Sequence, residues 1–125
     1  MSNTEAGIVL LLAEDDPDMR SLLCDELSEM GLRIVEAGNG DQALKYVTDH
    51  HPTLILTDLR MPAGGLDYVS RLRKCAPHVP IILMTAFGDA KTKAQALALG
   101  VAGYFDKPVH ISDLKLKVQE LLSPA

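Results

Sequence analysis

The fold of this chain follows from one segment, Leu54-Ile55-Leu56-Thr57-Asp58-Leu59-Arg60-Met61-Pro62. Three large apolar residues precede a Thr-Asp pair and a proline follows, which predicts a short strand that is buried on both faces. Asp58 then lies at the carboxyl end of that strand. A carboxylate in this place needs hydrogen bonds, a metal ion or water at a cleft. Taken alone, Asp58 is equally compatible with an acid that caps a loop.

Four further segments have the character of strands. Residues 8–13 and 81–84 are wholly apolar, whereas residues 33–36 and 102–105 are shorter or more polar. These segments alternate with helical patterns, so we predict an α/β three-layer sandwich with a five-stranded parallel sheet and five helices. Since right-handed crossovers bury the most apolar strands in the middle, the expected strand order is the flavodoxin-like 2-1-3-4-5.

Local signals predict where three of the helices begin. Asp16 followed by Pro17 is typical of an N-cap with proline at the first helical position. Asn39, with Gln42 three residues later, resembles a capping pair. Ser112-Asp113 predicts the start of the last helix.

The inner faces of the helices are predicted from their apolar residues. In the helix after Pro17 this face contains Met19, Leu22, Leu23, Leu27 and Met30. In the helix from about Asp89 it contains Ala90, Ala94, Leu97 and Ala98. Small side chains bury little apolar area, so we expect this helix to be the least firmly anchored. Cys24 and Cys75 are each expected to be a buried helical thiol.

Composition excludes several classes of protein. The 125 residues, 47% hydrophobic and 23% charged, suit one ordinary domain, which we expect to occupy residues 1–125 with a core from about 8 to 122. A net charge of −5 offers no basic surface to nucleic acid. No apolar run approaches the roughly 20 residues of a membrane span, and the first five residues lack a signal-peptide profile. We therefore expect a cytoplasmic location, without direct binding to nucleic acid or membrane.

Polar residues follow the predicted strands at their carboxyl ends. In an open parallel sheet ligands bind beyond these ends, where the strand order reverses. The residues there are Glu14, Asp15, Asp58, Thr85 and Lys107. Three neighbouring carboxylates repel one another, and a hard divalent cation resolves that conflict. We therefore predict a site for Mg²⁺, or Mn²⁺ in its place, that phosphoryl oxygens complete.

These residue types suit phosphoryl transfer. Asp58 is the expected nucleophile, since a carboxylate can form an aspartyl phosphate. Lys107 and the metal would neutralise charge on the transferring group, and Thr85 would offer it a hydroxyl. Each residue alone also has an ordinary structural interpretation, such as a surface lysine or a loop threonine. The hypothesis depends on their occurring together.

The chain resembles the receiver domains of two-component response regulators from Ile8 to Leu122. The matching pieces are Leu12-Ala13-Glu14-Asp15-Asp16 with Arg20, Leu56-Thr57-Asp58-Leu59-Arg60-Met61-Pro62, Met84-Thr85-Ala86 and Gly103-Tyr104-Phe105-Asp106-Lys107-Pro108. The resemblance implies a signalling switch rather than a conventional enzyme. It further implies that a histidine kinase or a phosphotransfer protein phosphorylates Asp58.

The resemblance also assigns finer roles. It implies that Asp15, Asp58 and the main-chain carbonyl of Arg60 hold Mg²⁺, with Glu14 acting through water. It makes Thr85 and Tyr104 a coupled switch pair and the Lys107-Pro108 bond cis. The fourth helix, fifth strand and fifth helix are the implied contact surface for a homodimer partner or an output domain.

One loop departs from the family pattern. The chain reads Met61-Pro62-Ala63-Gly64-Gly65-Leu66 where family members commonly have Met-Pro-x-Met-Asp-Gly, so the loop is one residue shorter and lacks the acid. Its adjacent glycines predict a permissive backbone. Two residues after Asp58 and Thr85 stand Arg60 and Phe87, which we expect to flank the phosphoryl group and slow its hydrolysis.

Two alternatives remain beside the receiver hypothesis. A pseudo-receiver, which acts only as a protein-binding module without phosphorylation, would account for the short loop. A phosphatase of the haloacid-dehalogenase type would need a second acid two residues after Asp58, where Arg60 stands. The chain also has no room for the cap domain of such an enzyme.

Overall fold

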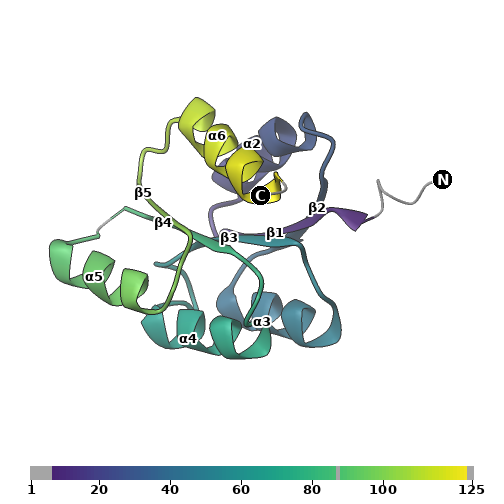
Figure 1. Cartoon of the computed structure of the whole chain (residues 1–125). Helices are drawn as coiled ribbons and strands as arrows, with labels where there is room; N and C mark the ends of the chain where they lie inside the picture. The colour runs from purple at the N-terminus through teal and green to yellow at the C-terminus, as the bar shows by residue number, and fades with distance from the viewer. Residues whose placement is uncertain (1–6, 87, 124–125) are drawn as a thin grey trace.

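The structure is a computed structural model that describes residues 7–86 and 88–123. Its strands are β1 (Val9–Ala13), β2 (Arg33–Ala37), β3 (Leu54–Asp58), β4 (Ile81–Thr85) and β5 (Gly103–Asp106). Its helices are α2 (Pro17–Ser28), α3 (Gly40–Asp49), α4 (Leu66–Cys75), α5 (Ala90–Ala98) and α6 (Ile111–Leu122). All strand pairs are parallel, in the order β2-β1-β3-β4-β5 (Figure 1). The predicted fold and strand order are confirmed.

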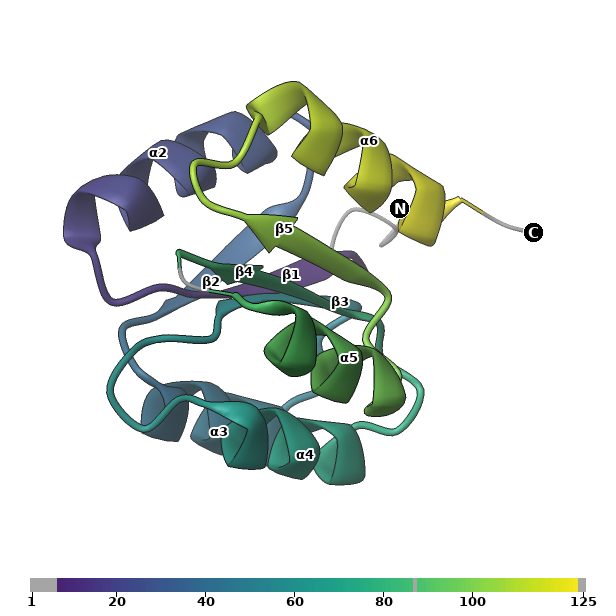
Figure 2. The ribbon, with the colours of Figure 1, turned by 90° about the vertical axis from the view of Figure 1, so that its left-hand side faces the viewer.

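Helices cover both faces of the sheet. Figure 2 shows α2 and α6 on one face and α3, α4 and α5 on the other. The apolar side chains of β3 alternate between the two layers, with Leu54 and Leu56 packed in the cluster of α2 and α6, and Ile55 in the opposite cluster. Burial on both faces explains why β1 is apolar throughout and why β3 and β4 are apolar until their carboxyl ends.

The buried polar groups are confined to one edge of the sheet. Within the described residues, the buried polar or charged side chains are Glu14, Thr57, Asp58 and Thr85. The strand register aligns this edge, since Ala13 pairs with Thr57, and Asp58 with Met84. The strands therefore bring these side chains together at their carboxyl ends, as predicted for Glu14, Asp58 and Thr85 but not for Thr57.

Two of the predicted helix starts are confirmed by their hydrogen bonds. The Asp16 carboxylate accepts the main-chain N–H groups of Asp18 and Met19, at 3.0 and 3.4 Å. The Asn39 side chain accepts the N–H of Gln42 at 2.8 Å. These caps depend on neighbouring residues alone, which is why the sequence predicts them well.

The predicted start of the last helix is wrong by two residues. Helix α6 begins at Ile111, with His110 at the N-cap position and no side-chain capping bond. The N–H of Leu114 donates to the carbonyl of His110 at 3.1 Å, so Ser112 and Asp113 already lie inside the first turn. Ile111 packs against the core beneath α2 and α6, and this contact favours the earlier start over the capping preference.

The predicted inner face of α5 is also wrong. Ala96 is its buried residue and Thr92 is half-buried, whereas Ala90, Ala94 and Ala98 are exposed and Leu97 is 51% exposed. An alanine side chain gains little from burial, so an alanine-rich pattern does not determine which side of a helix faces inward. The expectation that little apolar burial anchors α5 still holds.

Three smaller expectations about helices also fail. Leu22 was expected on the inner face of α2 and is 47% exposed. Cys75 is exposed at the end of α4, and Cys24 is half-buried rather than buried.

Within residues 7–86 and 88–123, no helix combines the length and apolar character needed to cross a membrane.

Candidate functional site

The carboxyl ends of four strands bring the predicted site residues together. Glu14 follows β1, Asp58 ends β3, Thr85 ends β4 and Lys107 follows β5. The main-chain N–H of Lys107 donates to the carbonyl of Thr85 at 2.9 Å, which ties the β5 end to the β4 end. The Lys107-Pro108 peptide bond is cis, as the resemblance implied.

Lys107 bridges two buried carboxylates. Its Nζ lies 2.8 Å from Oε1 of Glu14 and 2.8 Å from Oδ2 of Asp58. Glu14 is 0% exposed and Asp58 is 4% exposed. The other carboxylate oxygens accept main-chain N–H groups, Glu14 from Asp16 at 3.1 Å and Asp58 from Arg60 at 3.0 Å. Both carboxylates are therefore fixed in orientation.

The pKa values of Glu14 and Lys107 are shifted by burial and by the hydrogen bonds of the bridge. Burial raises the pKa of Glu14, although its hydrogen bonds with Lys107 and Asp16 act in the opposite direction. Burial alone would lower the pKa of Lys107, but its hydrogen bonds to Asp58 and Glu14 outweigh this, so the pKa is raised. Lys107 therefore remains a cation at neutral pH.

Three acids at this edge form a cluster suited to a metal ion. Carboxylate oxygens of Glu14, Asp15 and Asp58 lie within 4.8 Å of one another. Glu14 and Asp58 are buried, whereas Asp15 is exposed, so the cluster opens to solvent at Asp15. Three formal negative charges exceed the single charge of Lys107. Carboxylate oxygens are the ligands that Mg²⁺ prefers, so the donor set fits a hard divalent cation.

The shortened loop after β3 is held by main-chain hydrogen bonds. The N–H of Gly65 donates to the carbonyl of Leu59 at 2.8 Å, and that of Gly64 to Met61 at 2.9 Å. Gly65 has a φ of 94°, a region where glycine costs little, whereas Ala63 adopts a φ of 59°, which non-glycine residues seldom do. The permissive backbone that the sequence predicted therefore allows this loop to adopt a conformation held by main-chain hydrogen bonds.

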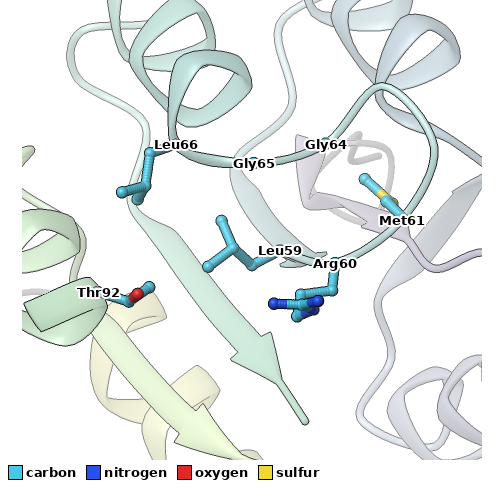
Figure 3. Close-up of a pocket in the computed structure, with 7 residues that line it drawn as sticks. All are labelled: Leu59, Arg60, Met61, Gly64, Gly65, Leu66 and Thr92. Atoms are coloured by element: carbon cyan, nitrogen blue, oxygen red, sulfur yellow. The ribbon is translucent and has the colours of Figure 1, made fainter. Parts of the chain in front are cut away.

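An open groove adjoins the strand end that carries Asp58. It has a volume of about 560 Å³ and is lined by Leu59, Arg60, Met61, Gly64, Gly65, Leu66 and Thr92. Figure 3 shows the loop residues on one side and Thr92 of α5 on the other. The groove therefore exposes the Arg60 side chain close to the phosphoacceptor candidate.

The two predicted switch residues lie side by side. A Cβ added to Gly88 would clash with the hydroxyl of Tyr104 and lie 2.8 Å from Cγ2 of Thr85. The Tyr104 hydroxyl is buried without a hydrogen-bond partner among residues 7–86 and 88–123, and Lys93 Nζ lies 5.8 Å from the centre of its ring. Burial raises the pKa of Tyr104. Phe87, expected to flank the phosphoryl group, lies outside the described residues.

Sequence reasoning missed a pair of hydroxyls behind Asp58. Tyr68, on the inner face of α4, is 3% exposed, and its Oη lies 2.9 Å from Oγ1 of Thr57. Thr57 in turn donates to the main-chain carbonyl of Asp58 at 2.9 Å. The available signal was a tyrosine in an apolar helix face and a threonine in an apolar strand, since buried hydroxyls need partners. The separation of Thr57 and Tyr68 in the sequence does not by itself indicate that their hydroxyls are in contact.

Tyr68 predicts a loss of stability at alkaline pH. Burial raises its pKa from 10.0 to about 12. Between these values the folded protein keeps the phenolic proton and the unfolded chain releases it, so stability falls as pH rises through this window. The contribution is about 2–3 kcal/mol. In urea unfolding at pH 9 and pH 12, Tyr68→Phe should lose less stability than the wild type, and equal losses would contradict the assignment.

Comparison with known proteins gives concordant matches. Residues 10–119 match the family model described as "Response regulator receiver domain". The chain is 30% identical over 114 residues to sporulation initiation phosphotransferase F of Bacillus subtilis, covering 90% of this chain and 92% of that protein. It is 33% identical over 114 residues to the regulatory protein AtoC of Escherichia coli, covering 90% of this chain and 25% of AtoC. It spans only a quarter to about half of the first curated relatives, with 47% of ycf27 of Cyanophora paradoxa covered.

Solved structures match along most of the chain. A CheY-like receiver domain protein of Methanospirillum hungatei superposes with a TM-score of 0.86 at 22% identity, covering 90% of this chain and 91% of that chain. A response regulator of Burkholderia pseudomallei superposes with a TM-score of 0.82 at 25% identity, covering 90% and 66%. That structure contains a phosphorylated aspartic acid, a calcium ion and citrate.

Proposed function

Because this chain belongs to the response regulator receiver domain family, we propose that Asp58 accepts a phosphoryl group from a histidine kinase or a phosphotransfer protein. Members of this family are signalling components of two-component systems rather than conventional enzymes. The observation that carries the proposal is the buried bridge of Lys107 between Glu14 and Asp58, with Asp15 on the open side.

In the proposed reaction, a carboxylate oxygen of Asp58 attacks the phosphorus atom of a phosphohistidine. The new O–P bond forms as the P–N bond breaks, and the electron pair leaves with the imidazole of the donor. Lys107 Nζ lies 2.8 Å from Oδ2 of Asp58, and it would neutralise charge on the transferred group. Thr85, buried at the end of β4, offers its hydroxyl to a phosphoryl oxygen.

The acidic cluster suggests how this chain would hold Mg²⁺, or Mn²⁺ in its place. We assign Asp15, Asp58 and the main-chain carbonyl of Arg60 as ligands, with Glu14 acting through water. A metal ion held by these residues would neutralise charge on the phosphoryl oxygens. The hydrogen bond from the N–H of Arg60 to the Asp58 carboxylate keeps the main chain of Arg60 next to that carboxylate.

The proposed output surface comprises α5, β5 and α6. Phosphorylation would draw Thr85 toward the new oxygens and bias the position of Tyr104. The exposed face of α5 carries Ala90, Ala94, Leu97 and Ala98, an apolar patch suited to a homodimer partner or an output domain. We propose one cytoplasmic receiver domain with a core of residues 8–122, which itself binds neither nucleic acid nor membrane.

Gly88 provides a test of the switch. Gly88→Ala would place a methyl group where the Tyr104 hydroxyl lies, so the ring should turn outward while Asp58 stays phosphorylatable. In ¹³C-tyrosine spectra assigned with Tyr104→Phe, the Tyr104 signals should shift before any phosphorylation. Gly7→Ala is the matched control, because a Cβ there has nothing within 4 Å. An unchanged Tyr104 signal in Gly88→Ala would contradict the contact between position 88 and the Tyr104 ring on which the proposed switch depends.

The phosphoacceptor function is tested by intact mass. Incubation with acetyl phosphate and Mg²⁺ should add one phosphoryl group to the wild type, and none to Asp58→Asn or to the wild type in chelator. Circular dichroism should show that Asp58→Asn remains folded. No gain in the wild type would favour the pseudo-receiver, which acts only as a protein-binding module. The shortened loop at Ala63-Gly64-Gly65 would then be the first place to look for the cause.

A further inference from the structure

The two hydroxyls behind Asp58 form a chain with a defined direction. Tyr68 Oη lies 2.9 Å from Thr57 Oγ1, and Thr57 Oγ1 lies 2.9 Å from the main-chain oxygen of Asp58. A carbonyl oxygen can only accept, so the single proton of Thr57 goes to Asp58. Tyr68 must therefore donate to Thr57. These two hydrogen bonds therefore connect helix α4 to the end of strand β3.

The two hydrogen-bonded hydroxyls hold one side of the peptide group between Asp58 and Leu59. The carbonyl of Asp58 accepts from Thr57, and the N–H of the same peptide group, on Leu59, donates to the carbonyl of Met84 in β4 at 2.9 Å. The peptide group that leaves Asp58 is thus bonded on both sides. The following N–H, on Arg60, donates to the Asp58 carboxylate at 3.0 Å. The orientation of the first peptide group therefore sets the direction of the carboxylate.

We propose that Thr57 and Tyr68 are positioning residues that hold the Asp58 carboxylate in the orientation required for phosphoryl transfer. Neither hydroxyl is bonded to the carboxylate, so both act through the main chain of Asp58. The proposal rests on the phosphoacceptor function of Asp58. Its physical basis is the dependence of transfer rates on the alignment of the attacking atom.

Stability alone gives little reason for these hydroxyls. Thr57 is 0% exposed and Tyr68 is 3% exposed, and burial of two hydroxyls removes them from water. The bond between Tyr68 and Thr57 adds little net stability, because replacing both of its partners with apolar groups of the same shape can be nearly neutral. A valine and a phenylalanine would fill the same space. What they could not do is hold the carbonyl of Asp58.

The test separates rate from stability. We would compare Thr57→Val, Tyr68→Phe, the double variant and Thr57→Ser by urea unfolding, and by the rate of phosphorylation with acetyl phosphate at saturating Mg²⁺. Thr57→Val should lower the stability, because it leaves the Tyr68 hydroxyl unpaired, and should lower the rate, because it removes the donor to the Asp58 carbonyl. The double variant should regain the part of the stability loss that comes from the unpaired Tyr68 hydroxyl, but it should remain about tenfold slower than the wild type because the Asp58 carbonyl still lacks its donor. Thr57→Ser, which keeps the hydroxyl, should restore the rate.

Thr53, which directly precedes the first residue of β3, provides the matched control. Thr53 accepts the N–H of Val9 at 3.1 Å and donates to the carbonyl of Gly7 at 2.9 Å, far from Asp58. Thr53→Val should lower stability without slowing phosphorylation. A double variant that reacts at the wild-type rate would overturn the positioning role. A wild type that gains no phosphoryl group would instead overturn the proposed function and, with it, this inference.

Discussion

Lys107→Met is expected to abolish phosphoryl gain at Asp58 and to destabilise the metal-free protein. The substitution leaves Glu14 and Asp58 facing each other without the ammonium that now lies 2.8 Å from each. Removing one member of a buried ion pair costs about 3–5 kcal/mol, and the lower end applies here because the Lys107 side chain is 19% exposed. Mg²⁺ should offset part of this cost, since it supplies positive charge to the same carboxylates.

The measurement is urea unfolding with and without Mg²⁺, beside intact mass after acetyl phosphate. Lys45→Met is the matched control, because Lys45 pairs with Asp49 at 3.1 Å on the surface of α3 and its side chain is 81% exposed. Such pairs contribute little, so this control should change neither quantity appreciably. The role given to Lys107 fails if its variant matches Lys45→Met in stability and still gains the phosphoryl group.

Gly40→Ala should displace the shortened loop and weaken Mg²⁺ binding. A Cβ at Gly40 would lie 2.6 Å from the carbonyl carbon of Ala63 and clash with its oxygen. Main-chain atoms cannot rotate away as a side chain does, so the loop must move. Overpacking of this kind costs about 1–3 kcal/mol. The displaced segment includes the neighbourhood of Arg60, whose carbonyl is a proposed ligand.

Gly38→Ala separates this steric effect from the loss of a glycine. A Cβ at Gly38 would lie 3.4 Å from the Arg20 side chain and 3.6 Å from that of Gln42, which are ordinary contacts. Isothermal titration with Mg²⁺ and urea unfolding should show losses in Gly40→Ala that are absent from Gly38→Ala. Equal behaviour of the two variants would mean that the loop does not support the metal site.

The sheet and the acidic edge were predictable because their determinants are simple. Strands buried on both faces must be apolar, and the segment ending at Asp58 stands out for that reason. Once the sheet is parallel, the carboxyl ends of its strands meet. Glu14, Asp58, Thr85 and Lys107 had to converge whatever their distances in sequence. The cis bond before Pro108 and the pairing of Thr85 with Tyr104 came from the family resemblance instead.

Other features depend on contacts that no local pattern encodes. The face of α5 could not be read from its alanines, and the start of α6 is set by the packing of Ile111 rather than by Ser112. The bond between Tyr68 and Thr57 joins a helix to a strand through the packed core. Such a contact is decided by the distance between two layers, which the sequence does not state.

The central claim is that Asp58, and no other acid of the cluster, carries the phosphoryl group. The most direct test is to phosphorylate the protein with acetyl phosphate and Mg²⁺, reduce it with borohydride and fragment both the peptide that contains residues 54–60 and the peptide that contains residues 14–16. Reduction of an aspartyl phosphate leaves homoserine in its place. We expect homoserine at position 58, with Asp15 and Asp16 unchanged. Homoserine at either of those acids, with Asp58 intact, would contradict the account.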